Sequence, residues 1–213
     1  EIPVERYLES VVSSEMNGAA PCEFLRTHAI VSRSWLLAAL LSRGAAGHRS
    51  LSQGRDCDGR GEVVRWYDRE DHDLYDVCAD DHCQRYQGLT KIVSGNAGAA
   101  VRETRGMVLL YDGAICDARY SKACGGMTDE YGTAWDEKIV PYLTSVSDGP
   151  LTWKPAISEE TAEAWIRSRP EAYCNSTDTA LLATILPDFD RETESFFRWT
   201  VRYDRTNLEE ILL

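Results

Sequence analysis

One carboxylate, Glu15, stands out because it falls on the apolar face of a predicted helix. It lies seven residues after Leu8 and three after Val12, so helical geometry places it on the stripe that these side chains form. Glutamate is almost never fully buried without a partner. An ion pair or a capping role near the helix end would explain this position. A general acid would explain it too, because partial burial disfavours the charged carboxylate and keeps a proton available for cleavage of a glycosidic bond.

Four potential metal ligands lie within twelve residues: His72, Cys78, His82 and Cys83. Two cysteines and two histidines are the inventory of a tetrahedral zinc site, which would be structural if all four positions were filled by protein. The spacing differs from that of a zinc finger. A Cys78–Cys83 disulfide, or free thiols beside solvated histidines, would use the same residues. Because His82 and Cys83 are adjacent, both reach one ion only if the backbone bends, and Cys124 could substitute for one of them.

A turn with two glycines, Gly125 and Gly126, follows a predicted strand. Glycines let a ligand approach the backbone closely, although such pairs also mark tight turns that bind nothing. Cys124 precedes them and could act as a nucleophile with His82 as its base. No third residue that would orient the base is identifiable, which weighs against a thiol hydrolase.

The elements that must position these groups are a mixture of helices and strands. Apolar spacing and capping residues predict helices over 5–16, 21–43 and 97–104, and further helices that begin at 158 and 206. Segments 108–111 and 115–120 flank Asp112-Gly113, which predicts a hairpin with a type I′ turn. Strict alternation predicts a half-buried strand over 197–203. Because no regular βαβ rhythm is present, the expected class is α+β, with antiparallel strands.

Composition argues against nucleic acid as a partner and against a membrane-spanning segment. The chain has 213 residues, 23 of them Lys or Arg and 35 Asp or Glu, which gives a formal net charge of −12. Such a surface repels phosphate backbones, so nucleic acid is not an expected partner. No apolar run approaches the roughly 18 residues that a membrane span requires. No signal peptide is visible, and both ends look trimmed.

Several segments, in order, resemble the SpoIID/LytB family, the stage II sporulation protein D and amidase-enhancer proteins of bacterial cell walls. Residues 11–16 (VVSSEM) resemble the family's VVAxEM signature, and residues 25–35 resemble its LKAQAVAARTY helix. The family segments AVxxTxGxVL, YxxxxGGxT and PYL are matched by residues 100–109, 120–128 and 141–143. The resemblance covers about residues 1–148. It implies one SpoIID-like domain there and leaves 149–213 as a C-terminal extension, expected to pack on the same domain.

The resemblance implies a lytic transglycosylase that cleaves peptidoglycan between N-acetylmuramic acid and N-acetylglucosamine, on strands stripped of stem peptides. Glu15 would protonate the leaving oxygen and then take the proton of the muramoyl C6 hydroxyl, which closes a 1,6-anhydro ring. The implied location is outside the cytoplasm, and a cell-wall amidase is a further implied partner. The alternative within the same family is an amidase-enhancer-type module that binds wall glycan without chemistry.

The resemblance also implies site residues. Residues 78–84 fit a CxxxHCQ segment that is thought to bind zinc in some family members. The turn at Gly125 and Gly126 would border the sugar groove, with hydroxyls from Tyr120, Ser121 and Thr128.

Three further sets of residues carry weaker expectations. Arg33 would hold Glu15 or a substrate carboxylate, unless it forms a salt bridge on the helix surface. His28 stands where the family usually has Gln, and no role is assigned to it. Trp35, Trp66 and Trp135 are expected in the core rather than at the sugar, because each has a large area to bury.

Overall fold

The structure is a computed structural model that describes residues 1–46, 74–79, 82–92, 95–135, 138–150, 158–192 and 196–212. Within these ranges the α-helices are α1 (Val4–Glu15), α2 (Cys22–Ala46), α3 (Gly95–Glu103), α4 (Tyr131–Ala134), α5 (Glu159–Arg167), α6 (Thr179–Ile185), α7 (Asp188–Arg191) and α8 (Arg205–Leu212). Two short 3-10 helices, η1 (Leu89–Lys91) and η2 (Tyr173–Asn175), and two strands, β1 (Leu110–Tyr111) and β2 (Ala114–Ile115), complete the described elements. The mixture is consistent with the expected α+β class.

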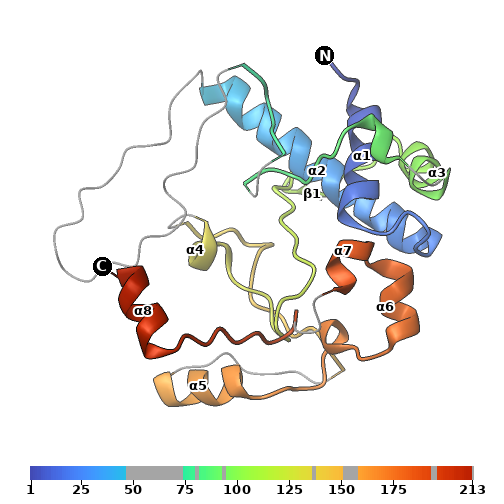
Figure 1. Cartoon of the computed structure of the whole chain (residues 1–213). Helices are drawn as coiled ribbons and strands as arrows, with labels where there is room; N and C mark the ends of the chain where they lie inside the picture. Colours follow the sequence, from blue (N-terminus) through green and yellow to red (C-terminus); the bar gives the residue numbers. More distant parts are fainter. Residues whose placement is uncertain are drawn as a thin grey trace.

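The core lies where α1, α2 and α3 pack together (Figure 1). On α1, Leu8, Val11 and Val12 are fully buried, as the sequence spacing predicts. Small residues of α3, among them Ala97 and Ala100, are buried against the other two helices. Small side chains let the helix backbones approach closely, so the bundle fixes the direction of α1 and of its last residue, Glu15. The predicted helices over 5–16, 21–43 and 97–104 are confirmed within a few residues.

The predicted hairpin is confirmed, with shorter strands than expected. Leu110 pairs with Ile115 and Tyr111 with Ala114 in an antiparallel register. Asp112 and Gly113 have φ values of 49° and 77°, and a type I′ turn requires positive φ at both of its central residues. After β2 the chain continues without strand pairing through residues 117–123 and leads to the glycine turn.

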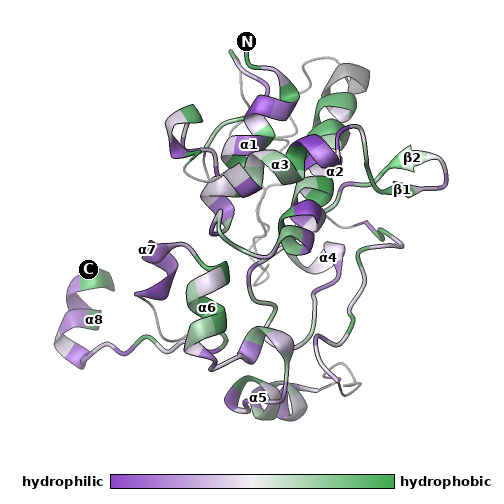
Figure 2. Cartoon of the chain, turned by 90° about the vertical axis from the view of Figure 1, so that its right-hand side faces the viewer, coloured by the Kyte–Doolittle hydropathy of each residue, from purple (hydrophilic) through white to green (hydrophobic). Residues whose placement is uncertain are grey.

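The C-terminal part of the chain contacts the bundle at the end of α1. The backbone N–H of Asn17 donates to the carbonyl of Ile185 at 3.0 Å, and its side-chain amide donates to Ala183 at 3.2 Å. Ile185 also packs against the core cluster. Figure 2 shows that α6 is largely hydrophobic, whereas α7, which follows it, is hydrophilic. The segment that contains α6 is therefore held against the helical bundle.

The predicted strand over 197–203 is wrong. In the described residues 196–212 the chain forms no strand, and Trp199 and Tyr203 are 74% and 58% exposed. Alternation produces a strand only when a neighbouring edge accepts its hydrogen bonds, and the β1–β2 pair lies elsewhere. The helices predicted to begin at 158 and 206 are present as α5, which Ser158 caps, and α8. Among the described helices, none has the length and apolar character needed to cross a membrane.

Candidate functional site

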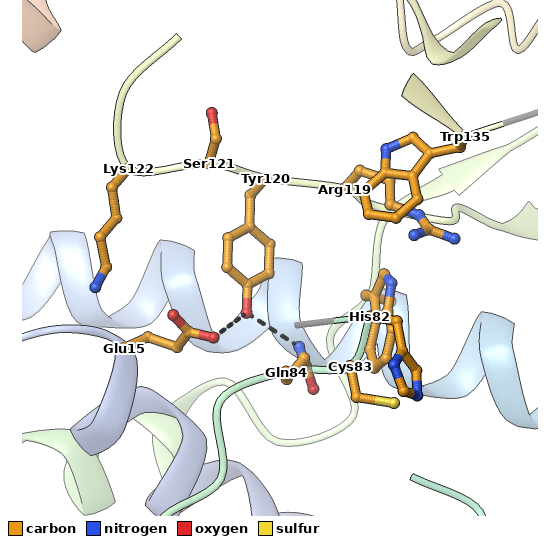
Figure 3. Close-up of a pocket in the computed structure, with 10 residues that line it drawn as sticks. Glu15, His82, Cys83, Gln84, Arg119, Tyr120, Ser121, Lys122 and Trp135 are labelled. Carbon is orange, nitrogen blue, oxygen red and sulfur yellow. Dashed lines mark hydrogen bonds between the residues drawn. The ribbon is translucent and has the colours of Figure 1, made fainter. Parts of the chain in front are cut away.

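A pocket of about 180 Å³ lies at the C-terminal end of α1 (Figure 3). Its walls come from α1, α2, the segments 82–84 and 119–122, and the residue that follows α4. The described lining residues are Glu15, Trp35, His82, Cys83, Gln84, Arg119, Tyr120, Ser121, Lys122 and Trp135. Glu15 was expected at the site from its helical position, and Tyr120 and Ser121 from the family resemblance; the structure brings all three to one place.

Glu15 is half-buried and held by two donors. Its Oε1 atom accepts the backbone N–H of Arg85 at 2.8 Å and the hydroxyl of Tyr120 at 3.4 Å. The Tyr120 oxygen in turn accepts a hydrogen bond from the side-chain amide of Gln84 at 3.3 Å. In the described part of the chain, both of these bonds to the carboxylate fall on Oε1. They fix its orientation without engaging Oε2.

Tyr120 remains a phenol at neutral pH. The residue as a whole is 37% exposed, but its hydroxyl end points inward, toward Glu15 and Gln84. Desolvation of that end raises the pKa of Tyr120, and the charge of Glu15 raises it further. The proton therefore stays on the hydroxyl, which can donate to the carboxylate.

His28 packs against Tyr120, although no role was assigned to it from the sequence. Its ring meets the ring of Tyr120 edge-on, with the two centroids 5.1 Å apart. Burial, with a smaller effect from the charge of Lys122, lowers the pKa of His28 from 6.5 to about 4. The neutral imidazole therefore supports Tyr120 by packing.

Two cationic side chains and two tryptophan rings form another part of the pocket wall. The Arg119 guanidinium lies 4.2 Å from the centroid of Trp135 and donates to Asp117 at 2.9 Å. Lys122 is paired with Asp190 of α7. Trp35 is 5% exposed, as expected of a core residue, but it also borders the pocket. The expectation that Trp135 is only a core residue is corrected, because it lines the pocket, and Trp66 lies outside the described residues.

Three of the four predicted zinc ligands are brought together beside Glu15. The ligand atoms of Cys78, His82 and Cys83 all lie within 4.8 Å of one another, and Cys78 Sγ is 3.3 Å from His82 Nε2. Such a set of soft and borderline ligands fits a zinc ion. His72, the fourth predicted ligand, lies outside the described residues. Cys124, the suggested substitute, is not in this group; among the described residues its sulfur lies instead with Asp148 and Cys174, 3.7 Å from the sulfur of Cys174.

The glycine turn does not border the pocket. Gly125 and Gly126 have φ values of 71° and 99°, so the turn has the expected backbone. Arg198 donates to the carbonyl of Gly125 at 2.9 Å, and a Cβ at Gly126 would lie 3.3 Å from the ring of Trp165. The close approach that the glycines allow is thus used by the C-terminal part of the chain, and the expected sugar contact at this turn stays a prediction.

Thr128 is also occupied within the protein. Its hydroxyl donates to the carbonyl of Thr144 and accepts the backbone N–H of Val146, both at 2.9 Å. It is not among the described residues that line the pocket. Its hydroxyl holds two chain segments together, and its predicted contact with substrate stays a prediction.

Arg33 is a core residue rather than a substrate contact. It is 1% exposed, and its Nη2 and Nε atoms donate to the two carboxylate oxygens of Glu5 at 2.7 and 3.1 Å. It also donates to the carbonyls of Val101 and Met107 at 3.1 and 3.2 Å. The prediction that it holds Glu15 or a substrate carboxylate is therefore corrected: it joins α1 to α2, to α3 and to the chain that follows α3.

The sequence analysis missed Gln84, Arg85, Arg119 and Lys122. Gln84 ends the CxxxHCQ segment and could have been noticed there. Arg85 meets Glu15 through its backbone N–H, which leaves no trace in the side-chain pattern. Arg119 and Lys122 flank Tyr120 and Ser121 in sequence, and this placement of basic residues on both sides of two hydroxyl residues was the signal available.

Known protein families and relatives match parts of this chain in sequence. The SpoIID family model, described as stage II sporulation protein, matches residues 1–111, and a model described as a domain of unknown function (DUF8618) matches residues 129–213. Over 145 residues the chain is 26% identical to stage II sporulation protein D of Bacillus amyloliquefaciens, a match that covers 68% of this chain and 38% of that protein. Over 100 residues it is 28% identical to the amidase enhancer of Bacillus subtilis (strain 168), which covers 43% of this chain and 14% of that protein.

These matches differ in extent. The chain spans well under half the length of either relative. The second family match begins at residue 129, before the boundary at 148 that the motifs suggested. The first family match covers more than half of the chain and includes Glu15 and the cluster of Cys78, His82 and Cys83. The chain therefore belongs to the SpoIID family.

Proposed function

We propose that this chain is a peptidoglycan lytic transglycosylase that cleaves the linkage between N-acetylmuramic acid and N-acetylglucosamine. The observation that carries the proposal is that Glu15 is the one carboxylate among the described residues that line the pocket. Glycosidases that use water or a covalent intermediate generally need a second carboxylate opposite the acid. A lytic transglycosylase needs one, because the nucleophile is the C6 hydroxyl of the substrate itself.

In the proposed reaction, Glu15 exchanges one proton with the substrate in each direction. The protonated carboxyl gives its proton to the glycosidic oxygen as the bond to the anomeric carbon breaks. The carboxylate then takes the proton of the C6 hydroxyl, whose oxygen bonds to the same carbon and closes the 1,6-anhydro ring. Oε2 is assigned to these transfers, because the Arg85 and Tyr120 donors hold Oε1. The acid is thereby regenerated without water.

The surroundings of Glu15 suit a muramoyl substrate. Trp135 offers an apolar ring of the kind on which sugar rings pack, and Ser121 adds a hydroxyl. Arg119 and Lys122 place two cations at the pocket of a chain whose net charge is −12. Muramic acid without its stem peptide carries a free lactyl carboxylate. Each of these cations is also paired with an aspartate, Asp117 or Asp190, at the side of the pocket, and could in addition contact this carboxylate. Denuded glycan strands, which lie outside the cytoplasm, are the proposed substrate.

The proposed zinc ion has a structural role. Cys78, His82 and Cys83 would hold it, with His72 as the expected fourth ligand. A bound ion supplies cross-linking of this segment. Gln84 and Arg85 follow directly after Cys83 and contact Tyr120 and Glu15. Fixing the backbone at Cys83 would therefore fix the groups that orient the catalytic carboxylate.

The second candidate is a module that binds wall glycan or an amidase and performs no chemistry. The match to a relative named amidase enhancer favours it. It needs the pocket but does not need a proton donor. The two candidates therefore differ in what they predict for Glu15.

The test is digestion of purified denuded glycan strands by the full chain, with anhydromuramoyl ends measured by mass spectrometry. We expect Glu15→Gln to lower their formation roughly 100-fold or more, as loss of a general acid does. Glu23→Gln, at an exposed glutamate of α2, is the matched control and should be silent. If the wild-type chain binds the strands but produces no anhydromuramoyl ends, the binding module replaces the enzyme. Equal product from Glu15→Gln would remove Glu15 as the acid.

A further inference from the structure

A second group of metal-type ligands lies apart from the Glu15 pocket. Cys124, Asp148 and Cys174 come from three segments that are distant in sequence, yet their ligand atoms all lie within 4.8 Å of one another. None of the three lines the pocket or belongs to the cluster at Cys78. We propose that these three residues form a second metal site, which takes a thiophilic divalent cation, Zn²⁺.

The separation of the two sulfurs fits a shared ion. Cys124 Sγ and Cys174 Sγ lie 3.7 Å apart. Two thiolates, each about 2.3 Å from a zinc ion at a tetrahedral angle, lie about 3.8 Å apart. Two thiols in simple contact would lie at a similar distance, so the separation does not decide the matter alone. The third group adds to the fit: the Asp148 carboxylate brings an oxygen ligand to the two sulfurs, as a zinc ion with mixed ligands accepts.

The backbone holds the three ligands in place without a metal. The Asp148 N–H donates to the carbonyl of Gly126 at 3.0 Å, and the Tyr173 N–H donates to the carbonyl of Asp148 at 2.8 Å. The Cys174 N–H donates to Asp148 Oδ2 at 3.0 Å. A continuous series of hydrogen bonds therefore connects the three ligand-bearing segments. Because the ligands are already gathered, an ion would bind with little further loss of conformational freedom.

The charge and burial of the group also suit a cation. All three residues are half-buried, so an ion held between them would be partly shielded from water. Two thiolates and a carboxylate around a divalent ion leave one net negative charge. The Arg198 guanidinium, bound to the carbonyl of Gly125, provides a positive charge next to it. Three protein ligands leave one tetrahedral position for water.

The site would connect the stretch between the two family matches to the second matched part of the chain. Cys124 precedes residue 129, where the second match begins, whereas Asp148 and Cys174 lie inside that match. Cys124 also follows Lys122, which lines the pocket, by two residues. An ion here would fasten the C-terminal region to the end of the pocket-lining segment. This role is independent of whether the pocket performs chemistry.

The experiment measures zinc in the full chain with the first cluster disabled by Cys78→Ser. The reduced chain is loaded with Zn²⁺, freed of excess ion and analysed for its metal content. We expect about one zinc ion per chain in Cys78→Ser and close to none when Cys174→Ser is added. Cys22→Ser, at an exposed cysteine outside both groups, is the matched control and should retain the ion. Substitution with Co²⁺ should give a thiolate-to-metal absorption band that Cys174→Ser removes.

Three outcomes would overturn the proposal. Zinc that stays bound in the Cys78→Ser, Cys174→Ser double variant must lie elsewhere. The second outcome is a disulfide in place of the metal site. In that case the wild-type chain purified without reductant is lighter by two hydrogens and yields a Cys124–Cys174 cross-linked peptide, and after reduction it binds no ion. Should Cys174→Ser fail to fold, Asp148→Asn keeps an acceptor for the Cys174 N–H but is a poorer ligand. Unchanged Zn²⁺ affinity in that variant contradicts the site.

Discussion

Neutralising Glu5 tests whether Arg33 belongs to the core or to the substrate site. Glu5→Gln keeps the size of the side chain and one oxygen acceptor but removes the negative charge opposite a guanidinium that is 1% exposed. In the wild type both carboxylate oxygens of Glu5 accept hydrogen bonds from Arg33. After the change, the buried cation retains only neutral acceptors, the carbonyls of Val101 and Met107 among them.

The expected loss of stability follows from this burial. Removing one partner of a buried ion pair commonly costs about 3–5 kcal/mol, because the remaining charge stays desolvated and unpaired. The Glu5 side chain is 27% exposed and the carbonyl acceptors remain, so we expect a smaller loss, about 2–3 kcal/mol. In a domain of this size each kcal/mol lowers Tm by about 2–4 °C. Glu5→Gln should therefore lower Tm by roughly 5–10 °C.

The assay is urea and thermal unfolding of the full chain, followed by circular dichroism. The control is Glu23→Gln, which breaks the pair of Glu23 with Arg26 on the surface of α2, where the two side chains are 84% and 36% exposed. Exposed pairs contribute about 0–1 kcal/mol, so this change should be close to neutral. If Glu5→Gln and Glu23→Gln lower the free energy of unfolding equally, the Glu5–Arg33 ion pair does not stabilise the core, and Arg33 returns as a candidate substrate contact.

Three further changes test the pocket and the turn. Tyr120→Phe removes a donor to Glu15 and should lower kcat on glycan about 10-fold with little change in KM; unaltered kcat would exclude this positioning role. Folding lowers the pKa of His28 from 6.5 to about 4. As pH falls from 6.5 to about 4, the unfolded chain therefore takes up the proton first, and the free energy of unfolding should decline by up to about 3 kcal/mol. His28→Gln should remove that part of the decline in the urea midpoint; an unchanged pH profile would contradict the assignment. Gly126→Ala should lower the free energy of unfolding by about 1–3 kcal/mol, because φ is 99° at this residue and the new Cβ would lie 3.3 Å from Trp165. The loss should exceed that of Gly113→Ala, where nothing lies within 4 Å of the new Cβ.

The parts of the fold that were predictable are those decided by neighbours in sequence. Leu8 and Val12 have the spacing of one helical face, and Asp112-Gly113 has the conformational preference of one turn type. The position of Glu15 follows from the same periodicity, because its stripe is buried and it is the last residue of the helix. Its place in a pocket could thus be anticipated before its partners were known.

The predictions that failed concern contacts between segments that are distant in sequence. Arg33 reads as a surface or site residue until α1 and α3 close around it, since its partners are Glu5 and carbonyls more than sixty residues away. The alternation over 197–203 is a sound strand pattern without a neighbouring strand. The glycine turn has the backbone that was expected, but the sequence does not tell whether a sugar or an indole fills the space beside it.

The C-terminal region bears directly on Glu15, although the sequence assigned it no role. Asn17, two residues beyond Glu15, is hydrogen-bonded to Ile185. The guanidinium of Arg85, whose N–H holds Glu15, lies 4.0 Å from the ring centroid of Phe189 in α7. Lys122 pairs with Asp190 of the same helix. Since α6 and α7 contact the chain on both sides of the carboxylate, substitutions there can alter its orientation without touching it.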